Sequence, residues 1–68
     1  MKLAQIFGKN VRRVRAEKGM TIEGLANEVG LSYSYVGELQ RGKRNPTLKV
    51  VERIAGALGV RAVDLLRE

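Results

Sequence analysis

The chain is 68 residues long, carries 13 Lys and Arg against 7 Asp and Glu for a formal charge of +6, and contains neither cysteine nor histidine. This length predicts a single domain over residues 1–68, and the missing side chains exclude disulfides, thiolate or imidazole metal sites, and a cysteine or histidine in catalysis. No apolar run approaches the roughly 18 residues of a membrane span, so we expect a cytoplasmic protein with no membrane association, no cofactor and no metal. The positive charge attracts polyanions without reading a sequence.

The first helix is expected over residues 2–18. Its apolar side chains recur at steps of four, four and three residues, which is the helical period: Leu3, Phe7, Val11 and Val14. Lysines and arginines occupy the other directions, so the helix is amphipathic and strongly basic away from its core face. Gly19 follows as the expected C-terminal cap.

Residues 22–41 contain the pattern around which the chain is organised. Two short helices, over residues 22–29 and 33–40, are expected on either side of a tight turn at Gly30, with Thr21 and Ser32 as their N-caps. Each helix has one apolar face, made by Leu25, Ala26 and Val29 in the first and by Val36 and Leu39 in the second. This arrangement predicts a helix-turn-helix, whose second helix usually lies in the major groove of DNA.

A basic loop and two further helices follow this motif. Arg41, Lys43 and Arg44 place three cations in four residues, and Pro46 prevents the helix from continuing. A fourth helix is expected after the cap Thr47, with an inward stripe of Leu48, Val51, Ile54, Ala55 and Leu58. A short fifth helix at about residues 61–67 carries Val63, Leu65 and Leu66, which cannot all face one core. The surplus predicts a partner surface, and fraying of a terminus is the alternative.

Once Val36 and Leu39 face inward, the outer side of helix 33–40 is available to a partner. Besides Arg41, it presents Tyr33, Ser34, Gly37 and Glu38. Glu38 can accept a hydrogen bond from a cytosine amino group, or can pair with Arg41 at i, i+3 spacing. Gly37 has two open explanations, which are close helix packing and close approach of DNA. Tyr35 lies on the flank of the helix, where core packing or a phosphate contact would each make sense.

Three blocks of the chain together resemble the phage-repressor and Cro-type helix-turn-helix family, also called the XRE family. They are VRRVRAEKGMT, GLANEVGLSYSYVGELQRGKRNPT and LKVVERIAGALGV, and they cover nearly the whole sequence. The resemblance implies an all-α fold, a compact five-helix bundle of the lambda repressor-like type. It also implies a transcriptional regulator that binds specific double-stranded DNA as a homodimer on a palindromic operator.

By position, the resemblance implies two sets of DNA contacts. The base-reading set is Tyr33, Ser34, Gly37 and Glu38. The phosphate-binding set is Thr21, Ser32, Arg41, Lys43, Arg44 and Asn45, to which Tyr35 is added from its place on the helix flank. Arg12 matches a common arginine of the family's first helix, and Gln40 stands where an acidic residue is common, which removes a possible ion pair with Arg12. We place the dimer interface at Val63, Leu65 and Leu66.

Other classes of function fit the sequence less well. The alternative to a regulator is a protein-interaction or antitoxin-like module on the same scaffold. An enzyme is not expected, because the acidic residues are scattered over predicted surfaces and no phosphate-binding glycine pattern occurs. RNA binding is disfavoured because the chain lacks a sheet with exposed aromatic side chains.

Overall fold

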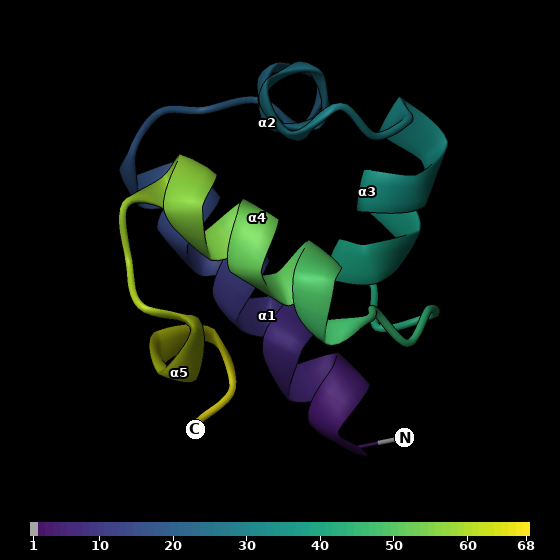
Figure 1. The fold of residues 1–68 in the computed structure, drawn as a ribbon, viewed down its shortest axis with the longest axis vertical. Helices are drawn as coiled ribbons and strands as arrows, with labels where there is room; N and C mark the ends of the chain where they lie inside the picture. Colours follow the sequence, from purple (N-terminus) through teal and green to yellow (C-terminus); the bar gives the residue numbers. More distant parts are fainter. Residues whose placement is uncertain (1) are drawn as a thin grey trace.

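The computed structural model describes residues 2–68 and contains five α-helices joined by short turns. They are α1 (Lys2–Glu17), α2 (Ile22–Val29), α3 (Tyr33–Gln40), α4 (Leu48–Leu58) and α5 (Ala62–Leu65). The expected all-α, five-helix fold is confirmed, and no strand occurs in this part of the chain. Figure 1 shows α4 in front of α1, with α2 end-on at the top, α3 on the right and α5 at the lower left. Among the described residues, no helix is long and apolar enough to cross a bilayer.

Hydroxyl side chains fix the starts of α2, α3 and α4. The Oγ atoms of Thr21, Ser32 and Thr47 each accept a hydrogen bond from the backbone N–H three residues on, at 2.9, 3.1 and 3.1 Å. Gly30 ends α2 in the left-handed conformation, with φ of 71°. These contacts hold α2 and α3 in the predicted helix-turn-helix.

A single apolar core receives side chains from all five helices. Its members are Phe7, Val11, Val14, Leu25, Ala26, Val29, Val36, Leu39, Val51, Ile54, Ala55, Leu58 and Leu65. Two leucines that we expected to face inward do not belong to it, because Leu3 is 44% exposed and Leu48 is 81% exposed. Each lies in the first turn of its helix, where the apolar stripe runs past the edge of the core.

The contact between α1 and α3 depends on Gly8. A Cβ atom at this position would lie 2.8 Å from the backbone oxygen of Gln40 and closer still to that of Leu39. Because real side-chain atoms do not approach backbone oxygens so closely, only glycine allows the last turn of α3 to rest on α1. The position of α3 is therefore set by a residue outside the helix-turn-helix.

The arginine that joins α1 to the end of α3 is Arg15, which the sequence did not single out. The Arg15 Nε donates to the Gln40 Oε1 at 3.2 Å, and its Nη1 donates to the Met20 carbonyl at 2.7 Å. Arg12 is exposed. One arginine thus braces both ends of the segment that contains α2 and α3.

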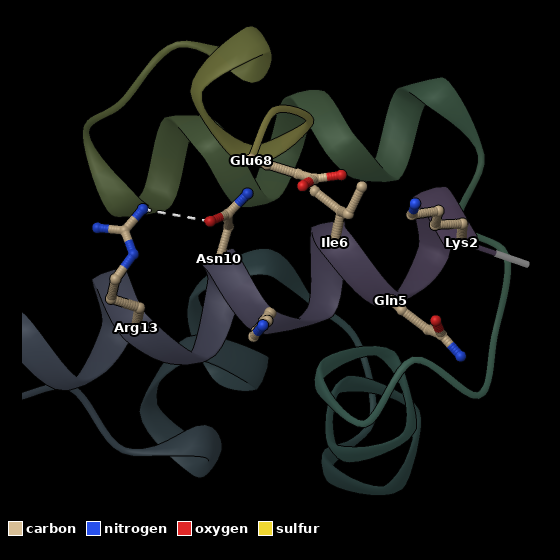
Figure 2. A pocket seen from close by; sticks show the side chains of 7 residues that line it. Lys2, Gln5, Ile6, Asn10, Arg13 and Glu68 are labelled. Atoms are coloured by element: carbon tan, nitrogen blue, oxygen red, sulfur yellow. Dashed lines mark hydrogen bonds between the residues drawn. The ribbon is translucent and has the colours of Figure 1, made fainter.

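The C-terminal residues are fastened to α1 by Asn10. Its Nδ2 donates to the carbonyls of Leu65 and Arg67 at 3.0 and 2.9 Å, and its Oδ1 accepts from Arg13 at 3.3 Å. Figure 2 shows these α1 side chains around an open pocket of about 550 Å³, with Glu68 at its rim. Helix α5 is shorter than expected, because the chain after Leu65 continues as an irregular tail.

Candidate nucleic-acid interface

Helix α3 is anchored by two side chains and presents its other side to solvent. Val36 and Leu39 are fully buried, whereas Tyr33 is 60% exposed and Ser34 is also exposed. The outward face therefore carries groups that donate and accept hydrogen bonds, on a helix held rigidly from below. This is the geometry that we predicted for residues 33–40.

Gly37 is buried, although we expected it to face a partner. A Cβ atom there would meet only the Arg41 guanidinium, at 3.5 Å, and no atom of another helix lies within 4 Å. Close packing between helices is therefore not the reason for this glycine. Its surface is covered by the Arg41 side chain, so any approach of DNA to the Gly37 backbone requires Arg41 to move.

The partner of Glu38 is Arg44, and not Arg41 as its spacing suggested. The Arg44 Nη1 lies 2.9 Å from the Glu38 Oε1, and the Arg44 Cζ lies 5.0 Å from the centroid of the Tyr35 ring. The side chains of Arg44 and Glu38 are 52% and 37% exposed. Tyr35 is half-buried and packs against the core, which agrees with the first of its two open explanations. Its ring also lies under Arg44, and the phosphate contact stays a prediction.

The basic loop folds back on the end of α3. The Lys43 N–H donates to the Glu38 carbonyl at 2.9 Å, and Gly42 adopts a left-handed φ of 74°. A Cβ atom at Gly42 would lie 3.0 Å from the Cγ atom of Gln5 in α1, so the loop packs closely on this helix. Arg41, Lys43, Arg44 and Asn45 are all exposed. Three cations thus border the outward face of α3, as predicted, and α1 supports the loop that carries them.

Both N-cap residues predicted to contact phosphate are exposed, and each hydroxyl oxygen already accepts a hydrogen bond from its own helix. Thr21 and Ser32 use their Oγ atoms to cap α2 and α3, but each hydroxyl retains a hydrogen that can be donated. Ser32 lines a surface hollow of about 610 Å³ together with Ser34, Tyr35, Glu38 and Arg44. Two predicted base readers and three predicted phosphate-binding residues thus line one hollow, while Thr21 lies at the other end of α2.

The predicted dimer interface requires a correction. Leu65 is fully buried in the core of the domain, so its side chain is not available to a second subunit. Val63 is 49% exposed, and Leu66 lines an apolar pocket of about 110 Å³. Leu3 and Leu48, which sequence reasoning placed in the core, line the same pocket. The sequence did contain a sign of their exposure. Leu3 and Leu48 each lie in the first turn of a helix whose later residues already fill the core.

Few other features of the surface suggest chemistry. No group of three acidic, histidine or cysteine side chains that could hold a metal ion occurs within residues 2–68. The outward face of α3, the cations beside it and the five-helix scaffold instead define a helix-turn-helix protein of the DNA-binding, repressor-like class.

Comparison with known proteins agrees with this class. The family model described as "Helix-turn-helix" matches residues 11–65. The control protein C.BamHI of Bacillus amyloliquefaciens is 44% identical over 62 residues, which are 90% of this chain and 76% of that protein. The chain belongs to the helix-turn-helix family of transcriptional regulators, of the XRE type that the sequence resembles. These regulators are a non-enzymatic class, in agreement with our prediction.

Two solved structures are similar over nearly the whole chain. The restriction-modification controller protein C.AhdI from Aeromonas hydrophila has a TM-score of 0.90 and 37% identity, covering 96% of this chain and 98% of that one. The controller protein C.Esp1396I, solved as a tetramer in complex with its natural 35 base-pair operator, has a TM-score of 0.86 and 34% identity. That alignment covers 96% of this chain and 86% of C.Esp1396I.

Proposed function

We propose that the chain binds a specific duplex DNA operator, with α3 in the major groove, and regulates transcription from the neighbouring promoter. The observation that carries the proposal is the pairing of fully buried Val36 and Leu39 with an exposed polar face bordered by three cations. A helix of this width fits the major groove, where base edges can be distinguished. Residues 1–68 are proposed to act as one DNA-binding domain in the cytoplasm.

Affinity and specificity come from different residues of this face. The exposed cations Arg41 and Lys43, with Thr21, Ser32, Tyr35 and Asn45, are proposed to contact phosphate and sugar, which fixes the position of α3 without reading the sequence. Arg44 is proposed to contact phosphate at the operator. Ser34, Tyr33 and Glu38 are the proposed base readers. Gly37 is proposed to allow close approach of the DNA backbone or bases once Arg41 moves aside, and it offers no side-chain contact.

We place the dimer interface at the apolar pocket of Leu3, Leu48 and Leu66, and its occupant is a second copy of the chain. Leu48 projects from the surface beside a pocket of about 110 Å³, which is about the size of a leucine side chain. A projecting residue beside a matching hollow is self-complementary, so a two-fold axis there would let each Leu48 enter the pocket of the partner. Asn45 and Pro46 line the pocket too, which brings the basic loops of both copies together.

Selection of binding sites from random duplexes by the purified protein tests the proposal. We expect enrichment of one sequence with two inverted half-sites, separated by about one helical turn, or about 34 Å, between their centres. Enrichment of no duplex, together with stoichiometric binding to another protein, would instead favour the protein-interaction or antitoxin-like module.

A further inference from the structure

Arg44 differs from the other cations beside α3 because it is held by two groups of the protein itself. The Glu38 carboxylate accepts from its guanidinium at 2.9 Å, and the Tyr35 ring lies beneath it at 5.0 Å. Arg41 and Lys43 form no ion pair in the described part of the chain. Glu38 is also the only acidic residue of α3. One positive charge of the interface is thus neutralised, in the free protein, by the residue proposed to read a base.

We propose that Glu38 is a positioning residue that withholds Arg44 from the DNA backbone until its carboxylate meets a base that donates a hydrogen bond. This inference rests on the proposed function. On arbitrary duplex, Arg44 stays with Glu38 and contributes no phosphate contact. At the operator, a cytosine or adenine amino group takes the place of Arg44 on the carboxylate, and Arg44 turns to a neighbouring phosphate.

The strength of the contacts suits such an exchange. An exposed ion pair and an exposed cation–π contact are each weak, so a phosphate can displace them. Opening the pair opposite a guanine, whose major-groove edge offers only acceptors, would leave the carboxylate with no hydrogen-bond donor. Opening it opposite an amino group replaces one hydrogen bond to the carboxylate by another. Release of Arg44 is therefore coupled to base identity, and the coupling adds a phosphate contact only at the correct site.

The dependence of affinity on salt measures this contact, because each phosphate contact adds about 0.9 to the slope of log affinity against log salt. We expect the slope of the native protein to be larger on the selected operator than on a length-matched random duplex by about 0.9 per subunit. Between 50 and 200 mM salt, this corresponds to a difference in affinity loss of about 3.5-fold per subunit and about twelvefold for a dimer.

The variant Glu38→Gln with Arg44→Gln removes the pair without changing the net charge. We expect its slope on random duplex to equal that of the native protein and its slope on the operator to fall by about 0.9 per subunit. Glu38→Gln alone frees Arg44, so the slope on random duplex should rise by the same amount. Lys43→Gln is the matched control, and it should lower the slope on both duplexes.

Each contrary result is distinct. If the slope of the double variant falls on both duplexes, Arg44 contacts phosphate at any sequence. If its slope falls on neither duplex, Arg44 does not contact phosphate at all. Either result overturns the proposal. An unchanged slope for Glu38→Gln on random duplex also overturns it. If the native protein prefers no duplex at all, the proposed function fails first. Far-UV circular dichroism of each variant verifies that the fold is intact.

Discussion

Glycine has three different uses at single positions in this chain. Gly8 lets the backbone of α3 approach α1, Gly30 adopts a left-handed turn, and Gly24 leaves room for its cap, since a Cβ atom there would lie 3.2 Å from the Thr21 Oγ. A sequence shows that glycine weakens a helix, but it does not show which neighbour requires it. For this reason we had assigned no role to Gly8 or Gly24.

Gly8→Ala is expected to destabilise the fold by about 1–3 kcal/mol, because the new methyl group overlaps backbone oxygens of α3 that cannot move freely. Gly56→Ala in α4 is the matched control. Nothing lies within 4 Å of its Cβ position, so alanine should stabilise by about 0.5–1 kcal/mol. Urea denaturation followed by circular dichroism measures both changes. Equal stabilisation by the two substitutions would show that α3 does not depend on Gly8.

Lys43→Ala is expected to weaken binding to operator and random duplexes alike, because an exposed lysine in the loop contacts phosphate and reads no base. With about three to four phosphate contacts per subunit, a dimer should show a salt slope of about −5 to −7, and the substitution should reduce it by about one per subunit. Titrations at several salt concentrations measure the slope. A loss confined to the operator would assign Lys43 to base recognition.

Helices α2, α3 and α4 could be predicted closely from the sequence, because their limits are set by local signals. Thr21, Ser32 and Thr47 cap their starts and glycines end two of them. Contacts between different elements were harder to predict from the sequence. The sequence placed Glu38 next to Arg41 by helical spacing, but the turn at Gly42 brings Arg44 to it instead. The hydrogen bond from Arg15 to Gln40 was also not predicted, because it joins residues 25 positions apart on two different helices.

Asp64 caps the start of α5, so this helix is expected to respond to acid. The Asp64 carboxylate accepts a hydrogen bond from the Arg61 backbone N–H at 3.1 Å. This bond is the main cause of the lowered pKa of Asp64. The Arg61 and Arg67 side chains lower the pKa further, and desolvation opposes them. A lowered folded-state pKa means that the cap is fully formed above the ordinary value near 3.9. Its contribution is lost as the pH falls through the lower folded-state value.

We therefore expect the amide resonances of residues 62–66 to shift together as the pH falls below about 4. In Asp64→Asn, which cannot titrate at this position, the same resonances should not show this transition. A pH titration by nuclear magnetic resonance compares the two proteins. A transition of equal size in the variant would place the acid-sensitive group elsewhere.

At the scale of the whole molecule, the three cations of the loop and the exposed leucines lie at different places. The cations of the loop border α3, whereas Leu3, Leu48 and Leu66 gather where the starts of α1 and α4 meet the C-terminal tail. The sequence predicted a surplus of apolar side chains but placed it on α5, because Leu65 was not known to fill the core. A burial pattern that depends on several helices at once cannot be inferred from the period of one.

Leu48→Glu is expected to weaken the dimer by roughly a hundred- to ten-thousandfold, since two leucines leave the interface and burying each contributes about 1.5–3 kcal/mol. The fold itself should be unaffected, because this side chain is 81% exposed in one copy. Val63→Glu is the control, as Val63 is exposed on α5 but does not line the pocket. Sedimentation equilibrium gives both dissociation constants. If Val63→Glu weakens the dimer and Leu48→Glu does not, the interface lies on α5.

The most direct test of the account is to map which side of the protein faces the base pairs. The chain has no cysteine, so Ser34→Cys provides a single thiol on α3 for a DNA-cleaving iron chelate, and Glu52→Cys provides one on the exposed side of α4. We predict cuts confined to the two half-sites, with the stagger of major-groove cleavage, from the chelate at position 34, and no localised cuts from position 52. Equal or stronger cleavage from position 52 would contradict the placement of α3 in the groove.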